Sequence, residues 1–554
     1  MMKAPVLFLL TLATTVTTQA QWTTDLSANT AVRVVTAGEA AAPLMADGPE
    51  GSTYVCWFEN GSGDYQLRMQ RLDAGGNKLW ADEGLLISDH PQNSAIFRYD
   101  LKSDADGKAV VAFQDERTGT LDVVAYKIAP DGTFIWGPDG VELPSPGTTG
   151  LAPSIATLSN GNTAISWNMD STPRSVGVQL VDPDGALLLA TPIVVSAAVN
   201  LTNFRPVDTS DGGFLLFYGV SAGGFGLPPW VLHAQRYDAV GTPVWANPVQ
   251  VSSKSIAFFH YPNAVPDGHD GFYVAFNTSN PDNASLTDVY LQRVRGNGTL
   301  WSAEGTRLDD SNTTQKFTGG RGVAWVNDNS GMMVALQVTD INQAQSGISV
   351  QRVDTAGVRQ LGDQAPTVLA VGAQAVQPWD VSATGDGALI LHATTAGFNQ
   401  TTLAATRVAL DGTAMWDPAQ QDICTLSSGK DDMQLSGLQN GQMVAVWQDG
   451  RTPAGIYAQN ITGLDIGTAV VDRAVAGSGI RLESNPAVSP VLLMPGTAAA
   501  LNVAVYDQQG RQVYAGEVAS AAGRSALPLG ALPAGAYAIR CLHDGQATVL
   551  RWVK

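Results

Sequence analysis

The sequence predicts an all-β protein made of a closed eight-bladed β-propeller followed by a small C-terminal β-sandwich. Three observations lead to this prediction. A motif of about 52 to 60 residues repeats through most of the chain, a column of tryptophans follows the same period, and the pattern changes after residue 462. Repeats of this length are typical of propellers and related repeat arrays.

Each repeat is marked by a glycine that ends a polar turn and opens a short apolar run. These glycines are Gly51, Gly107, Gly161, Gly213, Gly271, Gly331, Gly387 and Gly441. Five or six residues later comes a bulky position, called the slot. The slot holds Trp57, Phe113, Trp167, Tyr218, Phe276, Leu336, His392 and Trp447. The runs are too short for helices and too apolar for edge strands, so they predict strands buried on both faces.

A second hairpin completes each unit. Gln70-Arg71-Leu72-Asp73 is followed by Gly76 and Trp80, and the segment from Gln235 to Trp245 repeats this pattern. The same final position is filled by Trp136, Leu189, Trp301, Leu361 and Trp416. Two hairpins give four strands, the number in a propeller blade. We interpret the tryptophan column as buried packing rather than as a ligand cage.

The last unit ends after its third strand, Tyr457–Ile461, and no tryptophan follows it. Trp22 lies about 58 residues before Trp80, in step with the column. We therefore predict that the N-terminal segment supplies the missing outer strand and closes residues 21–462 into a ring. Closure removes the exposed edges of a sheet array. Seven blades or an open array of stacked sheets are the alternatives.

The first 20 residues predict a secretory signal peptide. One positive charge at Lys3 precedes an apolar stretch from Ala4 to Val16, and the small residues Thr18 and Ala20 mark a cleavage site before Gln21. A buried N-terminal helix is the alternative. No later segment reaches the roughly 18 apolar residues of a membrane span, so we expect a secreted protein or one attached to the outer-membrane surface, with no transmembrane segment.

Composition excludes some classes of partner. Asp and Glu number 50 against 31 Lys and Arg, which gives a net charge of -19. This charge disfavours nucleic acid and anionic lipid surfaces as partners. The three cysteines are too few for a disulfide framework in an exported chain of this size.

Residues 463–484 lack periodicity and predict a linker, and residues 485–554 predict short strands of a separate domain. Several short motifs occur there in a fixed order. Their residues are Asn485, Pro486, Gly510, Arg511, Leu532, Pro533, Gly535, Tyr537 and Lys554. This segment resembles the type A sorting domain of type IX secretion substrates of Bacteroidota, although Ala487–Ser489 replaces the usual aliphatic run. An immunoglobulin-like accessory domain is the alternative.

The resemblance implies an export route. A protein of this family crosses the inner membrane by its signal peptide and the outer membrane through the type IX translocon, which binds the sorting domain. The cargo is then released or attached to surface lipopolysaccharide. A glycan or protein ligand outside the cell is the remaining expected partner.

Motifs of known chemistry are missing from the sequence. It contains no His-Glu-x-x-His, Gly-x-Ser-x-Gly or P-loop pattern and no zinc-ligand spacing. Asp267-Gly268-His269-Asp270-Gly271 is the densest acidic turn, and its place in the repeat predicts a hairpin rather than a calcium loop. We predict no catalytic residue, no metal site and no cofactor.

Candidate binding residues lie in loops that the repeat does not explain. An Asp-x-Arg element occurs at Asp115–Arg117 and again at Asp449–Arg451, with a looser form at Asp170 and Arg174. We interpret these arginines as turn braces, and a ligand-facing rim is the alternative. One face of a propeller would carry Arg117, Phe204, Arg205, Trp230, His260, Tyr261, Arg321, Trp379 and Arg451.

Aromatic residues beside arginines suit sugar rings or peptide. The candidate ligand-binding residues are Trp230, His260, Tyr261, Trp379, Arg117 and Arg451. The leading hypothesis is a non-catalytic glycan- or protein-binding module. The alternative is a secreted carbohydrate-active enzyme, a glycosidase or lyase, for which two carboxyl groups roughly 5 to 10 Å apart in a central depression would be evidence.

Overall fold

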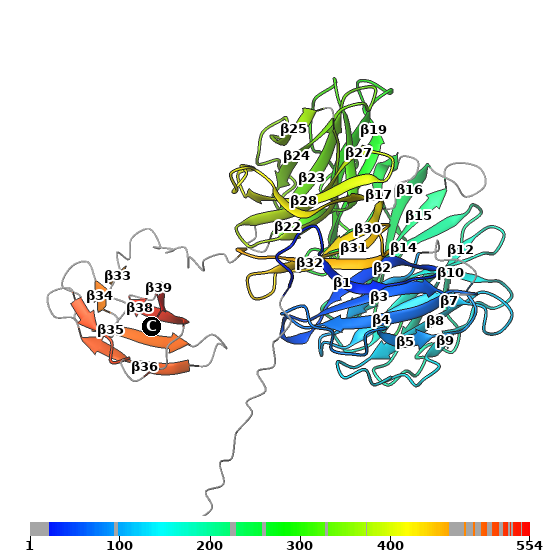
Figure 1. The fold of residues 1–554 in the computed structure, drawn as a ribbon, viewed down its shortest axis with the longest axis horizontal. Helices are drawn as coiled ribbons and strands as arrows, with labels where there is room; N and C mark the ends of the chain where they lie inside the picture. Colours follow the sequence, from blue (N-terminus) through cyan, green and yellow to red (C-terminus); the bar gives the residue numbers. More distant parts are fainter. Residues whose placement is uncertain are drawn as a thin grey trace, which may run out of the picture. The chain divides into compact units, whose positions relative to one another are not determined.

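The computed structural model describes residues 22–464, apart from 62, 93–97, 222–228, 257–261, 327–330 and 373. Near the C-terminus it describes 481–483, 491–493, 500–506, 512–519, 524–529, 532, 536–543 and 546–553. The chain divides into two compact units, residues 1–464 and 465–554 (Figure 1). The predicted signal peptide and most of the predicted linker lie outside the described residues.

The described part of the first unit is all-β and propeller-like, and its one helix is the short 3-10 turn Pro49–Gly51. Antiparallel groups of four strands follow one another in chain order. The first four groups are β2 (Glu39–Asp47), β3 (Thr53–Asn60), β4 (Gln66–Leu72), β5 (Leu85–Ser88); β6 (Asp100–Ser103), β7 (Ala109–Asp115), β8 (Asp122–Ile128), β9 (Val141–Leu143); β10 (Gly150–Thr157), β11 (Thr163–Met169), β12 (Ser175–Val181), β13 (Ile193–Val195); and β14 (Leu201–Asp208), β15 (Phe214–Ser221), β16 (Trp230–Tyr237), β17 (Val249–Ile256).

The same order continues through the second half of the unit. The groups are β18 (Ala264–Pro266), β19 (Phe272–Ser279), β20 (Thr287–Val294), β21 (Thr306–Arg307); β22 (Gln315–Val326), β23 (Gly331–Thr339), β24 (Ser346–Val353), β25 (Thr367–Gly372); and β26 (Ala375–Ala383), β27 (Gly387–Gly397), β28 (Gln400–Ala409), β29 (Gln421–Ser428). A parallel bridge between Arg321 and Asp380 joins the last two of these groups into one sheet.

The final sheet combines the two ends of the unit. Its strands are β30 (Lys430–Leu435), β31 (Met443–Asp449), β32 (Gly455–Ile461) and the N-terminal β1 (Thr30–Val34). β1 pairs antiparallel with β32, and Figure 1 shows the blue strand beside the orange one. This is the pairing predicted from the missing strand of the last repeat. Trp22 precedes β1 and is not part of it.

The second strand of each group carries the slot and is buried, as the apolar runs predicted. Trp57, Trp167 and Trp447 are fully buried. Apolar clusters form between successive sheets, and one of them joins the last sheet to the first. It contains Val444 and Val446 of β31 together with Val55 and Trp57 of β3.

Four tryptophans of the column link their part of the chain to the hairpin turn of the next unit. The indole Nε1–H groups of Trp22, Trp136, Trp245 and Trp301 donate to backbone carbonyls of Ala74, Pro183, Gly296 and Thr355, at 3.0 to 3.1 Å. Four members of the column pack against the apolar clusters but are half-buried, less than the predicted buried packing, and these are Trp80, Trp245, Trp301 and Trp416. The rings of Trp245 and Trp301 lie close to the turn glycines Gly298 and Gly357.

His392 is buried in its strand, as its slot position predicted. Its Nε2 lies 3.1 Å from the Thr406 hydroxyl, and Nδ1 has no hydrogen-bond partner. Burial lowers its pKa from 6.5 to about 4. The unfolded chain therefore binds a proton at a higher pH than the native protein does.

This difference predicts an acid-dependent loss of stability. The stability that His392 contributes is complete above about pH 6.5 and falls as the pH drops toward 4. In His392→Leu, urea unfolding measured between pH 7 and 4 is expected to show a weaker decline than in the wild type. An equal dependence of the unfolding free energy on pH in both proteins would contradict the assignment of this loss of stability to His392.

The second unit contains two sheets in its described residues. One has β33 (Arg481–Glu483), β34 (Val491–Leu493) and β37 (Arg524–Ala526), and the other has β36 (Gln512–Ala519), β35 (Ala500–Tyr506), β38 (Ala536–His543) and β39 (Gln546–Val553). Leu492 of the first sheet and Val503, Val505 and Ile539 of the second share one apolar core.

The structure describes two of the residues that carry the sorting-domain resemblance. Tyr537 is buried in β38, and Leu532 packs against the same core. Asn485, Pro486, Gly510, Arg511, Pro533, Gly535 and Lys554 lie outside the described residues. Across the described parts of both units, no helix has the length and hydrophobicity to cross a membrane.

Candidate functional site

The first strand of most groups is interrupted by a β-bulge at an equivalent place. The register shifts at residues 41–44, 151–154, 203–205, 318–323, 378–380 and 431–434. Ala42, Ala152 and Asp432 adopt left-handed backbone angles there, with φ of 53°, 52° and 50°. Such conformations cost energy in residues other than glycine, and bulges of this kind often redirect side chains at functional sites.

Side-chain amides of the neighbouring sheet hold these bulges. Gln114, Asn168 and Asn277 each follow a slot residue, and each accepts a hydrogen bond from a bulge N–H of the next group. Gln448 of β31 does the same for Ala42 of β2, at 3.1 Å. The same hydrogen bond, from a bulge N–H to a side-chain amide oxygen, therefore joins successive groups and also joins the last group to the first.

A set of equivalent positions, called the inner-strand ring, lies directly after the bulge, or at the matching place in β6, whose described pairs show no register shift. Each member pairs with the residue that precedes a slot residue, which establishes the equivalence. The ring contains Leu44, Asp100, Ser154, Arg205, Asp380 and Gln434.

Two adjoining cavities, A and B, lie along these first strands and have volumes of about 350 and 270 Å³. Every member of the inner-strand ring lines at least one of them. Lys102, Arg205 and Asn263 line both, so the cavities meet at these side chains. We call the two together the central cavity.

Asp100 is held at the junction by several donors. Its Oδ1 accepts from Lys102 Nζ at 2.8 Å, and its Oδ2 accepts from the Ile155 N–H at 2.9 Å. Arg205 Nη2 lies 3.8 Å from Oδ2. Burial alone would raise the pKa of Asp100, but the two cations and these hydrogen bonds outweigh it. Its pKa therefore lies below 3.8, and Asp100 is ionised at neutral pH.

Asp432 occupies a bulge and lines cavity B beside Trp379. Although its side chain is accessible from the cavity, enclosure by the surrounding protein raises its pKa above 3.8, and the charge of Asp431 raises it further. Cavity B therefore contains two carboxyl groups, those of Asp100 and Asp432, whose proton affinities are shifted in opposite directions. Such pairs divide the acid and base roles in many enzymes.

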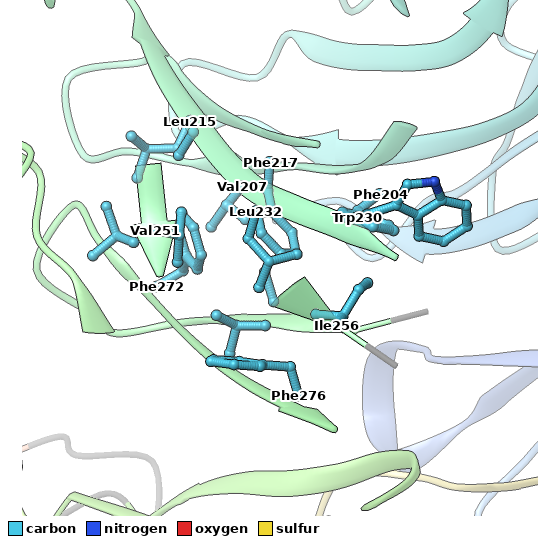
Figure 2. Packing of buried hydrophobic residues seen from close by; sticks show 14 of the residues in the cluster. Phe204, Val207, Leu215, Phe217, Trp230, Leu232, Val251, Ile256, Phe272 and Phe276 are labelled. Carbon is cyan, nitrogen blue, oxygen red and sulfur yellow. The ribbon is translucent and has the colours of Figure 1, made fainter. Parts of the chain in front are cut away.

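Trp379 is the bulged residue of β26, and Phe204 is the bulged residue of β14. Both line cavity B. Among the described members of the predicted ligand-binding set, Trp379 alone lines the cavity. Trp230 is buried in the apolar cluster of Figure 2, with its ring centroid 5.7 Å from that of Phe204. His260 and Tyr261 lie outside the described residues.

Arg451 is buried, with 5% of its side chain exposed. Its guanidinium donates to Asp449, to the carbonyls of Ser27 and Ala28, and to the Asn29 side chain. It therefore fastens the N-terminal segment to the last sheet. Burial by itself would raise the pKa of Asp449. Hydrogen bonds from the side chains of Arg451, Ser428 and Trp447 outweigh this effect and lower the pKa to about 2.

Arg117 is engaged within its own group. It contacts both carboxylate oxygens of Asp115, the Asp139 carbonyl and the Tyr126 hydroxyl. These are the contacts of a turn brace. Neither Arg117 nor Arg451 is among the residues that line the central cavity.

Sequence reasoning missed Asp100, Lys102, Asp380 and Asp432, because the first strand was not among the recognised columns. A fourth column is nevertheless present. The ring residue stands seven or eight positions before the repeat glycine, as Asp100 does before Gly107 and Arg205 before Gly213. Among the described residues, no group of three or more His, Cys, Asp or Glu is arranged to hold a metal ion.

No family model matches the chain, and no curated protein matches it either. Among solved structures it is similar to an ulvan lyase, a polysaccharide lyase bound to a GlcA–Rha3S saccharide, with 10% identity, coverage of 77% of this chain and 95% of that one, and a TM-score of 0.41. It is also similar to the Penicillium chrysogenum α-L-arabinanase bound to arabinobiose, with 14% identity, coverage of 59% and 96%, and a TM-score of 0.32. Similarity at this distance does not transfer a function.

Proposed function

We propose that this protein is an exported carbohydrate-active enzyme that hydrolyses a glycosidic bond in its central cavity. The observation that supports this is the pair Asp100 and Asp432, which line cavity B with pKa values shifted in opposite directions. Glycosidases require two carboxyl groups in different protonation states around the scissile bond. Trp379 adds an aromatic face, on which a sugar ring can stack.

In this proposal Asp432 acts as the general acid. It gives its proton to the glycosidic oxygen as the bond to the anomeric carbon breaks. Water then adds its hydroxyl to the anomeric carbon, and the remaining proton of that water returns to the Asp432 carboxylate. Asp100 stays ionised and stabilises the positive charge that develops on the sugar ring. Lys102 and Arg205 fix the orientation of Asp100.

A non-catalytic glycan-binding module is the second candidate. One observation favours it, because both oxygens of Asp100 already accept hydrogen bonds from the protein. In that case Asp100 ties β6 to β10, and the cavity binds sugar without cleaving it.

Asp432→Asn distinguishes the two. As an enzyme, the wild type should release reducing ends from a polysaccharide panel, and the variant should lose about 100-fold or more of this rate while still binding oligosaccharide. Activity should fall at high pH as Asp432 loses its proton and at low pH as Asp100 gains one. Asp431→Asn is the matched control. It should stay active, with the alkaline limb moved to lower pH, because removing its charge lowers the pKa of Asp432.

Binding without turnover by the wild type would support the module. Unchanged turnover in Asp432→Asn would remove that residue from the mechanism.

We further propose that the sheets of the first unit are the blades of one closed eight-bladed propeller. This is supported by the cyclic repetition of two contacts, the amide-to-bulge bond and the indole-to-turn bond. In each series the last sheet contacts the first, through Gln448 to Ala42 and through Trp22 to Ala74.

For localisation we propose export by the type IX route, with the second unit as the sorting signal. The support is the order of motifs between Asn485 and Lys554 together with the apolar core around Tyr537. The partners in this proposal are the type IX translocon and, after export, surface lipopolysaccharide or the external medium.

A further inference from the structure

The bulge of β2 lies between the two carboxyl residues of cavity B. β2 contacts β6, which begins at Asp100, and it contacts β30, which contains Asp432. Ala42 and Pro43 are the extra residues of this bulge, because the register of β2 against β3 passes over them. The backbone groups that a bulge leaves out of the strand ladder need hydrogen-bond partners elsewhere.

Side chains of the two neighbouring groups supply these partners. Ala42 donates its N–H to Gln448 Oε1 at 3.1 Å, and its carbonyl accepts from the Tyr99 hydroxyl at 2.6 Å. Pro43 has no N–H, and its carbonyl accepts from Gln434 Nε2 at 3.1 Å. Every backbone polar group of the two bulged residues is therefore bonded to a side chain, with one neighbouring group on each side.

Two of these side chains are next to the carboxyl residues in the chain. Tyr99 immediately precedes Asp100, and Gln434 stands two positions after Asp432. All four residues line cavity B. A short path of hydrogen bonds and backbone thus leads from one carboxyl residue through the bulge to the other.

Tyr99 is almost fully buried, and its hydroxyl holds two strands. Only 5% of its surface is exposed. The hydroxyl lies 2.6 Å from the Ala42 carbonyl of β2 and 3.0 Å from the Cys56 carbonyl of β3. Burial is the largest of the effects that raise its pKa, and the charge of Asp432 adds to them. The hydroxyl therefore stays protonated at neutral pH and lies within electrostatic range of Asp432.

We propose that the Ala42–Pro43 bulge sets the position of Asp432 relative to Asp100, and that Tyr99 is a positioning residue for this pair of carboxyl groups. This inference rests on the proposed function, in which both groups act on one glycosidic bond. The separation of such a pair determines how it can react. Displacement of a reacting group by about 1 Å can cost on the order of 100-fold in rate.

Tyr99→Phe tests this role, because it deletes the hydroxyl and retains the ring. On the best substrate of the polysaccharide panel, kcat should fall about tenfold or more while KM stays within about twofold of the wild-type value. Tyr54→Phe is the matched control, since its hydroxyl also donates to a carbonyl of a neighbouring group, that of Gly107 at 2.8 Å, and Tyr54 does not line the cavity. Both variants should lose a similar small amount of Tm, and the control should keep its kcat.

Gln448→Met tests the bulge from the other side. Gln448 does not line the cavity, and its amide oxygen holds the Ala42 N–H. Its kcat should also fall. In combination with Tyr99→Phe the loss should be smaller than the product of the two single losses, because both changes act through one bulge. A loss equal to that product would contradict the bulge as the shared element.

A titration of Asp432 examines the same role without turnover. Its pKa is measured by NMR on protein labelled with 13C at the Asp carboxyl carbons, and the signal is assigned by its absence in Asp432→Asn. Enclosure raises this pKa above 3.8, so in Tyr99→Phe it should move back toward that value, and in Tyr54→Phe it should not. The other charged groups beside Asp432 are unchanged in both variants, and they are Asp431 on its own strand and Arg98, Asp100, Lys102 and Arg205 in the cavity.

The outcomes separate this inference from the proposed function. If Tyr99→Phe keeps the wild-type kcat, or leaves the pKa of Asp432 unmoved, the positioning role is overturned and the proposed function stands. If the wild type turns over no saccharide, the proposed function fails, and the titration alone decides whether the bulge positions Asp432.

Discussion

Arg451→Ala is expected to destabilise the first unit by about 3 to 5 kcal/mol, the usual effect of removing one partner of a buried ion pair. Asp449 and Lys430 have no exposed side-chain surface, and the guanidinium of Arg451 lies 2.6 Å from the Asp449 carboxylate. The same guanidinium holds the carbonyls of Ser27 and Ala28. Its loss would therefore weaken the last sheet and release the N-terminal segment together.

Urea unfolding of the mature chain, followed by tryptophan fluorescence, measures this change. Arg174→Ala is the matched control, because Arg174 and Asp170 form the exposed version of the same element. We expect it to cost about 0 to 1 kcal/mol. Limited proteolysis should also cut Arg451→Ala before β1 at lower protease concentration than the wild type. Equal stability of the two variants would contradict the role given to Arg451.

Removing residues 532–554 is expected to abolish delivery to the cell surface while leaving the first unit folded. The deletion takes away β38 and β39, which pair with each other and, through β38, with β35. It also removes Tyr537, Ile539 and Cys541 from the core of the second unit. That unit should unfold, whereas the first unit shares none of this core.

Fractionation of a type IX-competent host, with antibody detection of the first unit, checks this expectation. The truncated protein should collect in the periplasm in protease-resistant form, and the full chain should reach the surface. Asp432→Asn is the control, since a change in the central cavity should not affect export. Surface delivery of the truncated protein would refute the sorting proposal.

The sequence was most informative where one residue type is required by backbone geometry. Gly107 ends its turn with φ of 74°, which favours glycine. Gly387 has no such angle, but a Cβ there would lie 1.9 Å from the Val408 carbonyl oxygen. Two different constraints therefore produce the same column. Together with the slot, this column was sufficient to predict the second strands, and the spacing of Trp22 from Trp80 predicted the pairing of the N-terminal segment with the last repeat.

The site was harder to predict because its strand does not keep a period of two. A bulge reverses the face to which later residues point, so alternation in the first strand is broken where the cavity begins. Asp432 and Trp379 owe their positions to such bulges. Arg451 presents a different difficulty. Its Asp-x-Arg motif is the same as that of Arg117, but its burial depends on contacts with a segment more than 400 residues away in the sequence.

The pairing of β1 with β32 also determines when the fold can be completed. Arg451 and Ser27 are 424 residues apart in the chain, so this contact has to wait until nearly the whole unit has been synthesised. At about 5 to 20 residues per second, that interval is tens of seconds during which β1 lacks its partner strand β32. An interrupted chain leaves β1 unpaired and remains a substrate for proteases. The pairing of β1 with β32 therefore makes completeness of the polypeptide a condition for protease resistance.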